Sequence, residues 1–144
     1  MKKLVCAVVL TACGCSGQTW SPVDPSTVNE TIILQETERY SRLLNVRVVG
    51  HVTNEMYLVG TQYAAGWYVG TYGKSAVGEA YFYIPTIRQL QPAVSDGPEH
   101  VTNVAAHEVA HAVTGPNHDK RHWCVMASVA RPTYPDPDPS TPCR

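Results

Sequence analysis

The spacing of apolar and polar residues divides the chain into helical and extended segments. In the first third of the chain, residues suited to a buried helix face recur every three or four positions, at Ile33, Thr37, Tyr40 and Leu44. This spacing predicts an amphipathic helix over about 28–44. Thr27 and Glu30 have the spacing of a capping box, in which each side chain bonds the backbone N–H of the other at the helix start.

From residue 46 the apolar period changes to alternation, which is typical of a half-buried strand. Val46, Val48 and Gly50 alternate with Arg47, Val49 and His51. Stretches rich in aromatic and β-branched residues follow near 56–60, 66–72 and 78–84, separated by glycines. We therefore expect a small sheet after the first helix.

A second helix is expected from Pro98 to Thr114. A capping residue comes before Pro98, which would occupy the first helical position. Gly115-Pro116 is expected to end the helix. The tail from Arg131 holds five prolines in fourteen residues, which excludes a helix or a central strand there. The order helix, strands, helix, irregular tail predicts an α+β domain over 26–144.

Length and charge narrow the classes of function. The 144 residues, with 11 Lys and Arg against 12 Asp and Glu, suit one compact domain with short tails. Such a balance offers no basic stripe for phosphates, so we expect no nucleic-acid partner. No apolar run is long enough to span a bilayer. We expect a monomer.

The first residues are typical of a secretion signal. Basic Met1-Lys2-Lys3 precedes a short apolar run that ends in Leu10-Thr11-Ala12-Cys13. This ending resembles the lipobox of bacterial lipoproteins, although an ordinary signal peptide with an incidental cysteine is the alternative. The resemblance implies a signal peptide over 1–12, a lipid on Cys13 and a tether over 13–25. It also implies a membrane anchor in the bacterial cell envelope, with the domain facing the periplasm or the exterior.

The predicted second helix carries residues suited to metal chemistry. His107 and His111 lie one turn apart on one face, where both imidazoles can bind a single Zn²⁺. Glu108 follows the first of them and can reach water at the metal without being a ligand, as the general base of a zinc peptidase does. The pattern predicts one catalytic zinc ion.

A third ligand is expected after the helix. The conformational freedom of Gly115 allows the chain to turn back toward the metal. His118 is the preferred ligand, because three histidines with one open position form a known catalytic zinc site. Asp119 is the alternative, and Asn117 and His122 are weaker candidates.

The segment from His107 to Met126 resembles the metzincin clan of zinc peptidases, and archaemetzincins most closely, through the spacing of Cys124-Val125-Met126 after His118. The resemblance implies a minimal zincin-like fold in which Met126 forms a turn beneath the metal. It also implies that the strand at 78–84 is the edge strand above the cleft. Gly78, Ala80 and Tyr81 would then bind a peptide substrate through the backbone, although an ordinary strand fits equally well.

The chain departs from the clan pattern in three places. Thr114 occupies the position of a glycine, and His118 comes one residue late. Asp119 and Ser140 stand where archaemetzincins have two of the four cysteines of a structural zinc site. The two cysteines that remain, Cys124 and Cys143, are expected to form a disulfide in an oxidising compartment.

These observations predict a membrane-tethered zinc metalloendopeptidase that acts on protein or peptide substrates. In it, the metal would activate water and Glu108 would serve as general base. Two alternatives stay open. One is a zinc peptidase of another clan with a different third ligand, and the other is a lipoprotein that binds zinc without catalysis.

Overall fold

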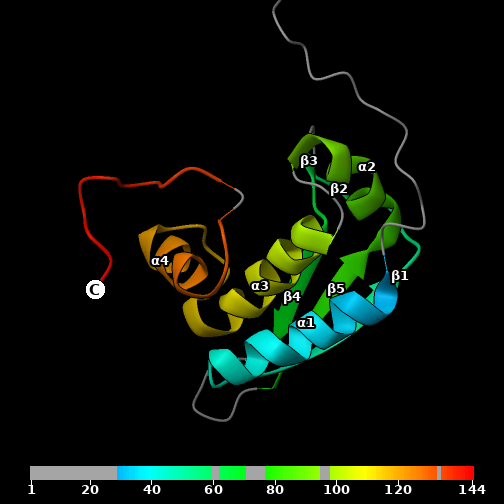
Figure 1. Ribbon diagram of the computed structural model, residues 1–144, viewed down its shortest axis with the longest axis horizontal. Coiled ribbons are helices and arrows are strands. Elements are labelled where there is room, and N and C mark those ends of the chain that lie inside the picture. Colours follow the sequence, from blue (N-terminus) through cyan, green and yellow to red (C-terminus); the bar gives the residue numbers. More distant parts are fainter. Residues whose placement is uncertain (1–28, 60–61, 71–76, 95–97, 133) are drawn as a thin grey trace, which may run out of the picture.

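The computed structural model describes residues 29–59, 62–70, 77–94, 98–132 and 134–144 (Figure 1). The elements in chain order are α1 (Glu30–Leu43), β1 (Arg47–Thr53), β2 (Leu58–Val59), β3 (Gln62–Tyr63), β4 (Gly66–Gly70), β5 (Val77–Tyr83), α2 (Ile84–Val94), α3 (Pro98–Thr114) and α4 (Lys120–Val129). The expected α+β class is confirmed, with a first helix, a mixed sheet and three further helices. The expected signal peptide, Cys13 and the tether lie outside the described residues.

Helix α1 begins two residues later than expected. Asn29 has extended backbone angles, with φ −112° and ψ 117°, and its side-chain oxygen accepts the N–H of Thr31 at 2.8 Å. Asn29 is therefore the N-cap, and Thr27 of the expected capping box lies outside the described residues. The expected buried face is confirmed, since Ile33, Thr37 and Tyr40 are all buried.

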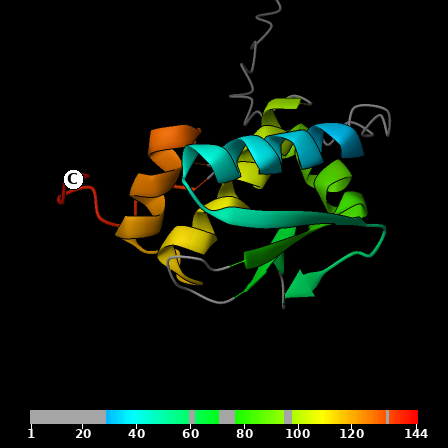
Figure 2. The same cartoon turned by 90° about the horizontal axis from the view of Figure 1, so that it is seen from below.

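The main sheet has the strand order β1-β5-β4. Strand β5 runs parallel to β1 and antiparallel to β4, while β2 and β3 pair with each other in a separate hairpin. Helices α1 and α3 lie on one face of this sheet, as two views agree (Figures 1 and 2). Among the described residues, Val49, Trp67, Val69 and Val77 are exposed apolar side chains of the three strands.

The expectation that the strand at 78–84 is an edge strand is wrong. Strand β5 is central and hydrogen-bonds to a neighbour on both sides, so it has no free edge for a peptide. Gly78 and Ala80 are buried, whereas Tyr81 is half-buried and stacks on His51 with ring centroids 4.9 Å apart. The physical reason is that alternating burial along a strand is common to central and edge strands, so the pattern alone does not distinguish them.

One hydrophobic core joins the sheet to α1, α2, α3 and α4. Its largest fully buried apolar side chains are Tyr40, Phe82, Ile33, Ile87, Met126, Val101 and Val109. Helix α3 contributes a row of buried small residues, and these allow it to pack closely against the sheet. In the described part of the chain, no helix has the length and apolarity needed to cross a membrane.

Candidate metal centre

Helix α3 places His107, Glu108 and His111, and it has the bounds that the sequence predicts, Pro98–Thr114. At its end Gly115 adopts a φ of 92°, a left-handed conformation that favours glycine, and its N–H bonds the carbonyl of His111 at 2.9 Å. The expected reversal of the chain at Gly115 is confirmed. It directs the next residues back toward the histidines of α3.

Helix α4 follows where the resemblance to metzincins implies a turn. Its N-cap is Asp119, whose carboxylate accepts the backbone N–H of His122 at 3.0 Å. Met126 lies within the helix and is fully buried, so the expected Met-turn is wrong. The physical reason is that Asp119 initiates a helix whose buried residues, His122 and Met126, recur one turn apart and face the core.

Four histidines come together between these two helices: His107, His111, His118 and His122. Each offers one ring nitrogen, and these nitrogens all lie within 4.8 Å of one another. The group could hold a metal ion. His107, His111 and His118 are thus brought together as expected, whereas Asp119, the alternative third ligand, caps α4 and is not part of the group.

Three of the rings have the spacing of zinc ligands. The Nε2 atom of His107 lies 3.0 Å from that of His118 and 3.2 Å from that of His111. Tetrahedral ligands with Zn–N bonds of ~2.0–2.1 Å are separated by about 3.3–3.4 Å, and their ring centroids by roughly 5 Å. The observed centroid separations within this trio are 4.8, 4.9 and 5.0 Å. The residues present therefore fit a metal ion with bonds of this length.

Hydrogen bonds fix the tautomer of His111. Its Nδ1 lies 2.7 Å from the carbonyl oxygen of Gly115, which can only accept. Nδ1 therefore carries the proton, and Nε2 presents its lone pair toward the Nε2 of His107. Zinc-binding histidines typically donate their second N–H to a carbonyl in this way.

The electrostatic environment keeps the four imidazoles neutral. Burial lowers the pKa of His107 well below its ordinary value, and the charges of the other three histidines lower it further. Burial is also the main cause that lowers the pKa of His111 and His118, and it lowers the pKa of His122 to about 3. Neutral imidazoles are the form that binds a metal, so the cluster needs no deprotonation at neutral pH.

Glu108 lies beneath strand β4. Burial raises the pKa of its carboxyl to about 8, and a hydrogen bond from the backbone of Tyr68 opposes part of that rise. The carboxyl packs so closely on Gly66 that a Cβ atom there would lie 2.7 Å from its Oε1. The ring of Tyr68 also faces His111, with centroids 6.5 Å apart. Strand β4 therefore contacts both the carboxyl of Glu108 and one histidine of the cluster, His111.

Two further residues lie at the cluster. The sequence favours His122 only weakly as a ligand, and its proximity follows from α4, whose N-cap Asp119 is the sequence feature that could have indicated this helix. The ring centroid of Tyr134 lies 5.7 to 6.0 Å from the ring centroids of His107, His118 and His122. Burial raises the pKa of Tyr134 to about 12, so its hydroxyl stays protonated at neutral pH.

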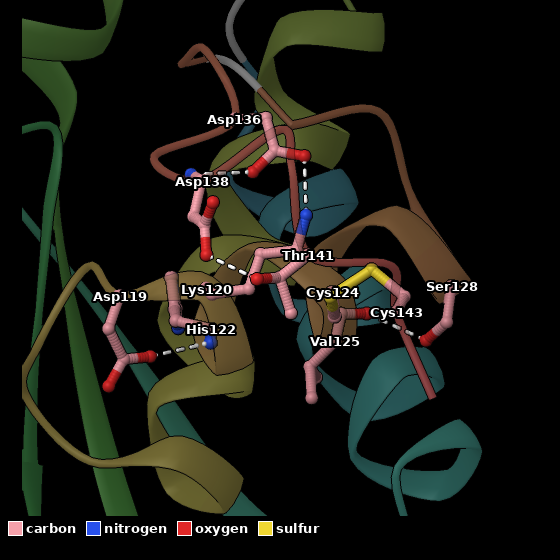
Figure 3. Close-up of a disulfide and its surroundings, with 10 residues drawn as sticks. All are labelled: Asp119, Lys120, His122, Cys124, Val125, Ser128, Asp136, Asp138, Thr141 and Cys143. Atoms are coloured by element: carbon pink, nitrogen blue, oxygen red, sulfur yellow. Dashed lines mark hydrogen bonds and ion pairs between the residues drawn. A yellow bond between two sulfur atoms is a disulfide. The ribbon is translucent and has the colours of Figure 1, made fainter.

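The C-terminal tail is fastened beside the cluster (Figure 3). The expected disulfide between Cys124 and Cys143 is confirmed and joins α4 to the end of the tail. Lys120 forms an ion pair with Asp136 at 2.6 Å, with both side chains largely buried. Both links follow Tyr134 in the chain, and they hold the rest of the tail against α4.

No protein-family model, curated protein or solved structure matches this chain.

Proposed function

We propose that the protein is a zinc-dependent metallopeptidase with a minimal zincin-like fold. The observation that carries the proposal is the close approach of the ring nitrogens of His107, His111 and His118, with the buried carboxyl of Glu108 on the same helix. Zinc bound there would polarise the scissile carbonyl and activate water for its attack.

Each residue then has a separate task. His107, His111 and His118 hold the metal through Nε2, and the carbonyl of Gly115 orients His111. Glu108, with a pKa raised by burial, accepts a proton during attack and returns it to the leaving amine. With a pKa of about 8, only part of the carboxyl is ionised at neutral pH, and the ionised form that accepts the proton increases as the pH rises.

The substrate strand is proposed to be β4 in place of β5. In the described sheet β4 is an edge strand, and it contacts α3 through Glu108. An extended peptide can add to such an edge through main-chain hydrogen bonds. The proposed substrate is therefore a protein or peptide that pairs with β4, and Gly78, Ala80 and Tyr81 have no binding role in the proposal.

The variant Glu108→Gln tests the catalytic part of the proposal. It keeps the side-chain shape and removes the exchangeable proton, so we expect retained zinc and fold with hydrolysis lowered by about 10²–10⁴-fold. The measurement is cleavage of a mixed peptide library by zinc-loaded protein, with Glu79→Gln as the control on the sheet. Equal activity of Glu108→Gln and wild type would contradict the role of Glu108. A wild type that binds zinc but cleaves nothing would favour a non-catalytic zinc-binding protein.

We also propose that the protein is a lipoprotein of the bacterial cell envelope. The lipobox ending at Cys13 supports a lipid anchor, and the disulfide between Cys124 and Cys143 suits an oxidising compartment outside the cytoplasm. We expect the wild-type protein in the membrane fraction. The Cys13→Ser variant should instead be found in the soluble fraction or keep its uncleaved signal peptide. The same distribution for both chains would contradict the anchor.

A further inference from the structure

His122 has a hydrogen-bonding pattern that leaves one nitrogen free. Its Nδ1 lies 2.9 Å from the hydroxyl of Thr114, and that hydroxyl donates its own proton to the carbonyl of Ala110 at 3.0 Å. The hydroxyl can therefore only accept from His122, so Nδ1 carries the hydrogen. Nε2 is left with its lone pair, and it is buried with no hydrogen-bond partner among the described residues.

The ring of His122 lies in the wrong plane to share a metal with His111. The two rings are stacked, with centroids 4.1 Å apart and planes only 14° from parallel. A metal lies close to the ring plane of each imidazole that binds it, because the lone pair lies in that plane. Two overlapping parallel rings therefore cannot direct their lone pairs at one ion, whereas the rings of His107 and His118 are inclined to that of His111 by 86° and 53°.

We propose that His122 is a positioning residue that leaves the fourth metal position open and offers Nε2 as a neutral acceptor to a water molecule held beside the three ligands. This rests on the proposed function, since it is the open position that separates a catalytic zinc site from a closed structural one. Burying an acceptor without a partner is costly, and a bound donor removes that cost.

Thr114 gains a role from the same contacts. This residue replaces the glycine of the metzincin pattern, and its hydroxyl joins the end of α3 to the ring of His122 on α4. Without the hydroxyl, neither nitrogen of His122 would have a fixed proton. Thr114 therefore selects the tautomer that His122 presents to the site.

Nitrogen NMR of the histidine side chains in the zinc-loaded protein tests the proposal without measuring activity. We expect zinc to change the Nε2 resonances of His107, His111 and His118 in the manner of coordination, while His122 keeps its proton on Nδ1 and shows no coordination. Thr114→Val should give a mixture of His122 tautomers, and Thr114→Ser should restore the single one. Coordination of zinc by the Nε2 of His122 in wild type would overturn the proposal.

Cobalt substitution and kinetics supply an independent measurement. His122→Ala should keep the ligand-field spectrum of a site with three nitrogens and an open position, and it should lose no more than about 100-fold in metal affinity. The kcat of His122→Ala for peptide cleavage should fall about 10–100-fold with KM unchanged. The kcat of Thr114→Val, which keeps the imidazole ring of His122, should also fall. Full kcat in both variants would overturn the acceptor role. If wild type cleaves no peptide, the proposed function fails, yet the NMR result still decides whether His122 is a ligand.

Discussion

Gly66 on strand β4 is the residue on which the position of Glu108 depends most directly. A Cβ atom at Gly66 would lie 2.5 Å from the Cγ of Glu108 and 2.7 Å from its Oε1, distances that real contacts do not reach. The absence of a side chain therefore allows the buried carboxyl to lie against the strand. Close packing of this kind makes even one added methyl group costly.

Gly66→Ala should lower the free energy of unfolding by about 1–3 kcal/mol, because the added methyl overpacks the contact with Glu108. Urea unfolding of the metal-free protein measures this change. Gly50→Ala is the matched control on β1, where the nearest atoms lie 3.2 to 3.3 Å away and need move only slightly. Gly50→Ala should therefore lower the free energy of unfolding by less than Gly66→Ala does.

A double-mutant cycle identifies the cause. In the Glu108→Ala background the side chain that meets the new methyl is gone, so Gly66→Ala should cost less there than in wild type. An equal cost in both backgrounds would show that Gly66 is needed for a reason other than the carboxyl of Glu108.

At the residue scale, the helical spacing of His107, Glu108 and His111 fixes their common location, and this part of the site could be predicted from the sequence. His118 could be anticipated too, because Gly115 reverses the chain at a known distance. His122 was underestimated, since its approach depends on a second helix that brings the ring under Thr114. Tertiary packing of this kind leaves little trace in local spacing.

Helix α4 and the tail behave as one unit at the scale of elements. Arg121 of α4 donates to the carbonyl of Val113 at 3.0 Å, which ties the helix to the end of α3. The disulfide and the ion pair between Lys120 and Asp136 then tie the tail to α4. The position of Tyr134 beside the histidines therefore depends on these links.

Replacing Cys124 and Cys143 with serine should lower the free energy of unfolding by about 3 kcal/mol, the effect expected for closing a loop of this length. Urea unfolding with and without a reductant measures it. Wild type in reductant should approach the stability of the double-serine variant, which itself should not respond to reductant. A wild type whose stability is unaffected by reduction would contradict a structural role for this bond.

The elements differ in how far local sequence determines them. Helix α3 has a proline at its start, a glycine at its end and a buried row of small residues, so its bounds follow from the sequence. Helices α2 and α4 were not predicted. Pro85 in the first turn of α2 favours the end of strand β5 as readily as a helix start, and α4 was obscured by the resemblance to a Met-turn.

At the scale of the whole molecule, two layers position the site. Helices α1 and α3 cover one face of a three-stranded sheet, and α4 lies beside the C-terminal end of α3 (Figures 1 and 2). The α+β class could be predicted from the change of apolar period along the chain. The order of the strands could not, because alternation alone does not distinguish a central strand from an edge strand, as β5 demonstrates.

The proposed function requires that His107, His111 and His118 bind one zinc ion. Elemental analysis of the folded Cys13→Ser chain, after it is offered zinc and passed through a desalting column, measures this binding. We expect one zinc per chain in the protein with all three histidines and a large loss in His107→Ala, His111→Ala and His118→Ala, with each variant still folded by circular dichroism. A folded protein with all three histidines that retains no zinc or other transition metal would show that the site does not bind one.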